Sequence, residues 1–139
     1  MIILSVDYGR ARTGIAVCDR SETIASPVAT IKEYDRERLA DKIADICRER
    51  QAEEIVLGLP RNMDGSEGES AKNVREFADI LREKTGLGVV LRDERMTTIT
   101  AHNYLNATDT RGKKRKAVVD SVAAVIILED YLSYRRNRS

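Results

Sequence analysis

The sequence predicts an α/β fold with a mixed five-stranded sheet flanked by helices. The first observation is the order of the hydrophobic patterns, because three β-type runs come first and two more then alternate with helical patterns. The second is the connections: short polar turns join the first three runs, as in antiparallel strands, whereas helical crossovers deliver the later strands parallel. The third is size, since 139 residues with 42% apolar content can bury the core of one domain, residues 1–139.

The first three strands form a predicted meander. We expect strands at 2–7, 13–18 and 23–31, with turns at 8–12 and 19–22. The first run is almost wholly apolar and ends in Asp7, which indicates a strand buried on both faces. Pro27 lacks a backbone N–H, so it indicates that the third strand lies at a sheet edge or carries a bulge.

Two helix–strand pairs follow. We expect helices from Asp35 to about Gln51 and from the 66–69 region to Gly86, and strands at 54–59 and 87–92. Asp35 is a candidate N-cap, and Ser66 and Glu69 have the spacing of a capping box. The first helix has one apolar stripe, made by Leu39, Ile43, Ile46 and Cys47. The second has another, made by Val74, Phe77, Ala78 and Leu81.

The last third of the chain is predicted to be helical around a basic loop. We expect a short helix from a cap at Thr97 or Thr98 to Leu105, a Gly/Lys/Arg loop over 111–116 and a helix from Ala117 to about Tyr134. The last helix is apolar nearly all round, so it should be largely buried. Asp120 would then stand in its first turn.

Cysteine usage and hydropathy favour a cytoplasmic protein. Cys18 and Cys47 lie far apart in apolar surroundings with no metal-binding spacing, so we expect reduced thiols in the core. The apolar run before Asp7 is too short for a signal peptide, and the run over 122–128 is far too short to span a membrane. We expect no association with membranes.

The overall charge balance says little about partners, but its distribution does. The net charge is +1, yet residues 109–139 hold eight Lys or Arg against four Asp or Glu. Such a cluster fits contact with a polyanion, and a solvated segment of mixed charge is the alternative.

Carboxylates stand at the ends of several predicted elements. Asp7 closes the first strand, Asp93 and Glu94 close the last, and Asp120 opens the last helix. Ligands collect outside the carboxyl ends of parallel strands, so these acids could meet at one rim of the sheet. A divalent cation such as Mg²⁺ removes the repulsion between clustered acids, and two such ions can catalyse phosphodiester hydrolysis.

Each acid also has an ordinary structural explanation. An Asp at a strand end is common in turns. Asp120 could interact favourably with the dipole at the N-terminus of its helix, and Glu94 could form an ion pair with Arg92 or Arg95. An acid in a buried apolar helix, however, is hard to explain by solvation. The acids taken together therefore favour a metal site more than any one of them alone.

Four motifs in order cover nearly the whole chain. They are Asp7-Tyr8-Gly9 with Arg12-Thr13-Gly14-Ile15-Ala16-Val17; Gly58-Leu59-Pro60 with Asn62-Met63-Asp64-Gly65; Asp93-Glu94-Arg95-Met96-Thr97-Thr98; and Lys116 with Asp120-Ser121, Ala123-Ala124 and Ile127-Leu128. In these motifs the sequence resembles the YqgF/RuvX family. The resemblance implies an RNase H-like fold, a relation to RuvC-type Holliday-junction resolvases, and a nuclease that matures the 5′ end of bacterial pre-16S rRNA.

The resemblance also implies a set of catalytic residues. It makes Asp7, Glu94 and Asp120 the metal-binding acids, with Mg²⁺ or Mn²⁺ as cofactor and Asp93 as the alternative to Glu94. Neighbouring residues of a strand point to opposite faces, so only one of the two should ligate, and we favour Glu94. RuvC-like resolvases carry two acids on the last helix, whereas this sequence has Ala at 123 and 124, so a second metal should be held weakly.

Basic residues near these motifs are candidate contacts to phosphate. Those expected to bind the nucleic-acid backbone are Arg10, Arg12, Lys113, Lys114 and Arg115. Lys116 lies one helical turn before Asp120, so we expect it to hold the scissile phosphate.

The glycines and the tyrosine near the first turn can each be interpreted in two ways. Gly9 and Gly14 could let the backbone approach a phosphate or could simply form a tight hairpin. Tyr8 could contact substrate or pack in the core.

Three functions follow for testing. The first is a metal-dependent endonuclease or exonuclease acting on structured RNA, with pre-rRNA, either free or on the ribosome, as the substrate that the resemblance implies. The second is a resolvase of DNA junctions, which would need a symmetric homodimer rather than a monomer. The third is a non-catalytic RNA-binding assembly factor, against which the presence of all three acids argues.

Overall fold

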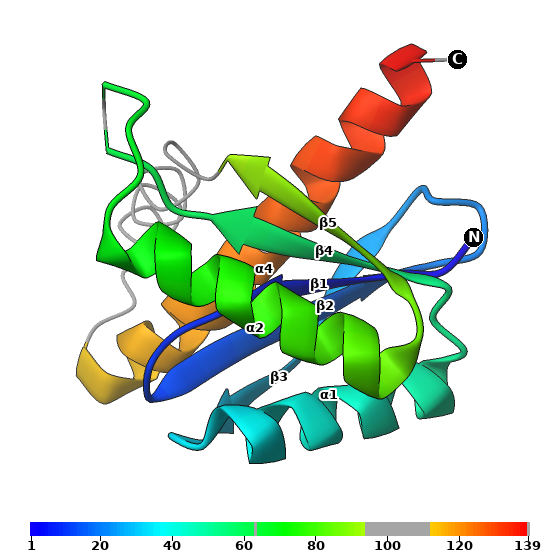
Figure 1. Ribbon diagram of the computed structural model, residues 1–139. Helices are drawn as coiled ribbons and strands as arrows, with labels where there is room; N and C mark the ends of the chain where they lie inside the picture. The colour runs from blue at the N-terminus through cyan, green and yellow to red at the C-terminus, as the bar shows by residue number, and fades with distance from the viewer. Residues whose placement is uncertain (63, 94–111, 139) are drawn as a thin grey trace.

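The computed structural model describes residues 1–62, 64–93 and 112–138, and gives only the helical backbone for 112–121 and 138 (Figure 1). Its strands are β1 (Ile3–Asp7), β2 (Arg12–Cys18), β3 (Ala25–Lys32), β4 (Glu54–Leu59) and β5 (Gly88–Asp93). Its helices are α1 (Arg36–Arg50), α2 (Glu69–Thr85) and α4 (Gly112–Arg138). Each strand lies within two residues of its predicted bounds. The short helix expected between Thr97 and Leu105 falls outside the described residues.

All five strands join one mixed sheet in the order β3-β2-β1-β4-β5. β1 pairs antiparallel with β2, and β2 with β3, whereas β4 lies parallel to both β1 and β5. The predicted sheet is therefore confirmed. β3 is an edge strand, and its register against β2 shifts where Ala16 pairs with Pro27, so both expectations for this proline hold.

Helices cover both faces of the sheet. In Figure 1, α1 and α2 lie in front of the sheet and α4 lies behind it. Leu4 and Val6 of β1 belong to the core shared with α1 and α2, whereas Ile3 belongs to the core under α4. The buried Ser5 hydroxyl donates a hydrogen bond of 2.6 Å to the Ala124 carbonyl of α4. Alternation along β1 thus assigns each of its residues to one helical layer.

The ends of α1 follow the prediction, but the start of α2 does not. The Asp35 carboxylate accepts a hydrogen bond from the Arg38 N–H, as an N-cap should. The expected capping box of α2 is wrong, because Gly68 is the N-cap and makes no side-chain hydrogen bond. Ser66 instead donates both its N–H and its hydroxyl to the Asp64 carboxylate. The hydrogen bonds of Ser66 therefore stay within the loop, and α2 begins after the loop, at Glu69.

α4 begins earlier than expected. Residues 112–116, predicted as a loop, are helical, and the helix starts at Gly112 rather than Ala117. Lys and Arg are good helix formers, so the basic run continues the helix instead of interrupting it. Asp120 consequently lies in the third turn, not the first, and the N-terminal dipole no longer explains it.

The C-terminal half of α4 is fixed at the amino ends of β1 and β4. The Tyr131 hydroxyl donates to Glu54 Oε1 at 2.6 Å. Arg135 donates to both oxygens of Glu22, at 2.6 and 3.3 Å, and the Met1 ammonium group binds the same carboxylate at 3.0 Å. α4 therefore runs antiparallel to β1.

Glu22 gives a pH-dependent test of this anchor. Hydrogen bonds from Arg135 hold the pKa of Glu22 below its ordinary value, so its stabilisation is complete above that ordinary pKa and is lost as pH falls through the folded-state pKa. We expect Glu22→Gln to lower the free energy of unfolding at pH 7 by up to about 1 kcal/mol. Urea unfolding of both proteins measures the difference, which should shrink at pH 3. The exposed Glu49→Gln change is the control, and an equal loss there would contradict the anchor.

Candidate active site

Asp7 and Asp93 end two strands but belong to opposite faces of the sheet. Asp7 is half-buried and follows Ser5 by two residues, so alternation puts it on the α4 face. On β5, Arg92 reaches that same face, since its guanidinium donates to Asp130 of α4 at 2.7 and 3.0 Å. Asp93 is the next residue, exposed and level with Leu59, and alternation therefore directs it to the α2 face.

The antiparallel course of α4 brings position 120 to the end of β1. The bond between Ser5 and Ala124 sets the starting point. Asp7 lies two strand residues further on, about 7 Å, and Asp120 lies one helical turn before Ala124, about 6 Å. Because the helix and strand run in opposite directions, both steps lead to the same rim of the sheet.

The remaining predicted ligands lie outside the described part of the chain. This applies to Glu94 and to the Asp120 side chain. Within the described residues, no three His, Cys, Asp or Glu side chains come together as a metal site. The structure thus places Asp7 and the backbone of position 120, and the third ligand stays a prediction.

Arg12 contributes a half-buried cation to the α4 face. On β2, residues 12, 14 and 16 lie on the same face of the sheet. Ala16 belongs to the core under α4, and Gly14 pairs with Asp7. The Nη1 atom of Arg12 is buried and has no hydrogen-bond partner in the described structure. A buried, unsatisfied guanidinium N–H is costly, and a phosphate oxygen would satisfy it. The side chains of the other basic candidates on α4, namely Lys113, Lys114, Arg115 and Lys116, lie outside the described residues.

The structure of the turn after β1 bears on the interpretations of Gly9 and Tyr8. A Cβ atom on Gly9 would collide with the Arg12 carbonyl oxygen, so the tight turn itself requires glycine. The Thr13 hydroxyl binds both the N–H and the carbonyl of Gly9, at 3.3 and 3.4 Å. Tyr8 stacks on Phe77, with ring centroids 4.3 Å apart, so it packs against the core. It nevertheless also faces a cleft.

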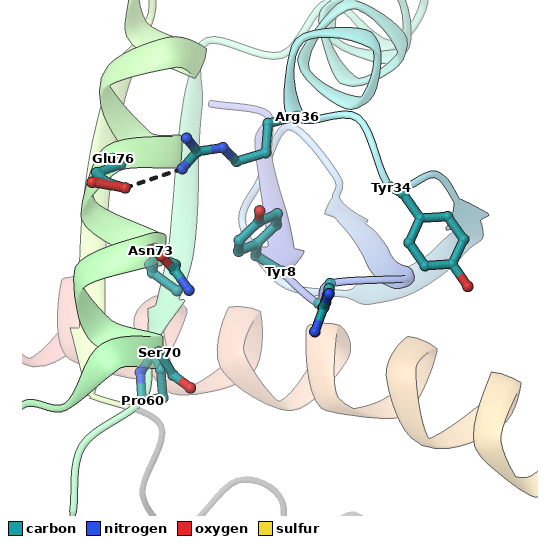
Figure 2. Close-up of a pocket in the computed structure, with 10 residues that line it drawn as sticks. Tyr8, Tyr34, Arg36, Pro60, Ser70, Asn73 and Glu76 are labelled. Carbon is teal, nitrogen blue, oxygen red and sulfur yellow. Dashed lines mark hydrogen bonds and ion pairs between the residues drawn. The ribbon is translucent and has the colours of Figure 1, made fainter.

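This cleft, of about 550 Å³, lies on the α2 side of the sheet and was not predicted (Figure 2). Its lining includes Tyr8, Arg10, Tyr34, Arg36, Asn73 and Glu76. These residues come from the turn after β1, the connection between β3 and α1, the first residue of α1 and the first half of α2. No sequence spacing links them, so only the fold could reveal them together.

Solved structures with a similar fold identify the fold class of this chain. RuvC from T. thermophilus, solved in complex with a Holliday junction substrate, matches with a TM-score of 0.63, covering 100% of this chain and 98% of that one at 12% identity. The Fowlpox virus resolvase, solved with Holliday junction DNA, matches with a TM-score of 0.57, covering 97% and 99% at 14% identity. The fold of this chain is therefore RNase H-like.

Sequence comparisons give the family. The model "RuvX: Holliday junction resolvase" matches residues 1–134. A relative from Clostridium tetani, named "Putative pre-16S rRNA nuclease", is 38% identical over 99% of this chain and 100% of its own length. A relative of the same name from Streptomyces avermitilis is 42% identical over 96% of this chain and 86% of its own. The chain belongs to the RuvX family.

Proposed function

We propose that this chain is a metal-dependent endonuclease or exonuclease that cuts structured RNA and matures the 5′ end of pre-16S rRNA. The observation that carries the proposal is the meeting of Asp7 and position 120 at one rim of an RNase H-like sheet. The names of the Clostridium tetani and Streptomyces avermitilis relatives support the substrate. We place the activity in the cytoplasm, in keeping with the two free, buried thiols of Cys18 and Cys47.

A divalent cation, Mg²⁺ or Mn²⁺, would fit the carboxylates that we propose for the α4 face. Asp7, Glu94 and Asp120 would hold it through carboxylate oxygens, the ligands that hard cations prefer. Alternation on β5 supports Glu94 over Asp93, because Asp93 belongs to the other face. When bound, the ion would stabilise the negative charge that develops during phosphodiester cleavage.

The basic residues of this chain would position the substrate. Arg12 would donate its buried Nη1 N–H to a phosphate oxygen beside Asp7. Lys116, one turn before Asp120, would hold the scissile phosphate. The remaining cations would attract the backbone without reading sequence; they are Arg10, Lys113, Lys114 and Arg115.

DNA junctions are the second candidate substrate. The description of the family model as a Holliday junction resolvase favours them. Resolution needs two symmetric sites, hence a homodimer. Sedimentation of a monomer only, at working concentration, would count against this alternative.

The first test is Asp7→Asn, which removes one anionic ligand with little change in volume. We expect it to keep the fold, measured by circular dichroism, and to abolish metal-dependent cleavage of pre-16S rRNA. Asp45→Asn, an exposed carboxylate of α1, is the matched control and should cleave like the parent. Equal activity in the Asp7→Asn protein and the parent, both free of contaminating nuclease, would refute the active site.

The second test separates Asp93 from Glu94. Mn²⁺ binding is measured by electron paramagnetic resonance in Asp93→Asn and Glu94→Gln. We expect Glu94→Gln to lose Mn²⁺ affinity and Asp93→Asn to retain it, because the two residues should point to opposite faces. The reverse pattern would transfer the role to Asp93.

The third test concerns the basic start of α4. If Lys113 and Lys114 contact phosphates, the logarithm of RNA affinity falls linearly with the logarithm of salt concentration. Changing both to Ala should reduce the magnitude of that slope by about 0.7 per contact for single-stranded RNA. Arg48→Ala with Arg50→Ala, on exposed positions of α1, is the control pair. A slope unchanged in the Lys113/Lys114 variant would show that substrate enters elsewhere.

The fourth test concerns Lys116. A residue that holds the scissile phosphate acts mainly on the transition state, so Lys116→Ala should lower kcat more than it raises Kd. Single-turnover cleavage and binding titrations give the two values. A loss confined to affinity would make Lys116 an ordinary backbone contact.

A further inference from the structure

The cleft on the α2 face begins where β1 ends. Tyr8 directly follows Asp7, and it stacks on Phe77 of α2. Pro60 follows β4, the parallel neighbour of β1, and also lines the cleft. The candidate metal site and the cleft therefore share one rim of the sheet but open on opposite faces.

The charges of the cleft favour an anion. Arg36 and Glu76 form an ion pair of 3.2 Å across it, as Figure 2 shows, so they largely cancel. Arg10 is exposed at the cleft and makes no ion pair within the part of the chain described here. The named lining thus carries one positive charge that is not neutralised by a neighbour.

The cleft also offers an aromatic ring and hydrogen-bonding groups. Tyr34 is 77% exposed, a large unburied aromatic surface at the edge of the cleft. Asn73 and Ser70 line the cleft from the start of α2 and can donate or accept hydrogen bonds.

These features fit one nucleotide. A base can stack on Tyr34 and bond to amide and hydroxyl groups, while Arg10 contacts its phosphate. The volume of about 550 Å³ is that of a small-molecule pocket, which admits an unpaired nucleotide but not a base-paired helix. We propose that this cleft binds one unpaired nucleotide of the RNA substrate, next to the bond that is cut.

The proposal rests on the proposed function and explains how structured RNA could be recognised. A strand crossing the rim at Asp7 and Tyr8 would present a phosphate to one face and a neighbouring nucleotide to the other. Cleavage would then require an unpaired residue beside the scissile bond. Binding of one unpaired nucleotide needs only one aromatic side chain for stacking. This agrees with a sequence that has only six Phe, Tyr and Trp residues.

The test measures RNA binding in full-length protein carrying Asp7→Asn, in EDTA, so that no cleavage occurs. The probe is a ten-nucleotide single-stranded RNA with one 2-aminopurine, whose fluorescence falls on stacking. We expect Tyr34→Ala to weaken binding at least fivefold and to lose the quenching, and Tyr34→Phe to retain both. Arg10→Ala should also weaken binding, whereas the exposed Arg50→Ala control should not. A fully base-paired RNA should bind all variants alike.

The outcomes separate this proposal from the proposed function. Equal RNA affinities of the parent, Tyr34→Ala and Arg10→Ala proteins would contradict nucleotide binding in the cleft, even if the protein with Asp7 intact cleaves RNA. Loss of affinity in both variants would support nucleotide binding in the cleft. This holds even if the protein that keeps Asp7 cleaves no RNA and the proposed function fails.

Discussion

The antiparallel packing of α4 across the sheet is the constraint on which the candidate active site depends. The Ser5–Ala124 hydrogen bond fixes the helix at the middle of β1, and the bonds of Tyr131 and Arg135 fix its far end. With both points set, the turn that carries Asp120 must approach the carboxyl end of β1. A helix running the other way would leave Asp7 without a second acid from α4.

The sheet and its layers could be predicted because hydrophobic periodicity and connection length determine them. Local chemistry predicts a buried strand before Asp7 and an edge position for Pro27, and the structure confirms both. Asp7 as a strand-end acid follows from the same pattern. The face of the sheet to which Asp7 belongs is known only from the structure. There Ser5, two residues earlier, bonds to Ala124 of α4.

The errors arose where local signals compete. A glycine followed by four basic residues resembles a loop, but Lys and Arg favour helix, and α4 begins at Gly112. Ser66 has the spacing of a cap, yet Asp64 two residues earlier captures its hydrogen bonds. The cleft was not predicted for a different reason: Tyr34 and Asn73 line the same cleft only because α1 packs against α2.

Ala123 and Ala124 show how packing limits the chemistry of this face. Both are almost fully buried, and Ala124 lies against Ser5. At the positions where the family resemblance leads us to look for a further acid, this chain therefore has small residues that let the helix pack on the sheet. Weak binding of a second metal ion, expected from these two alanines, stays a prediction.

The location of a bound metal tests the central claim most directly. Crystals soaked in Mn²⁺ and measured at the manganese absorption edge should show an anomalous peak on the α4 face, within coordination distance of the Asp7 and Asp120 carboxylates. A peak bound to Asp93 on the α2 face, or saturating Mn²⁺ with no peak at Asp7, would contradict the account.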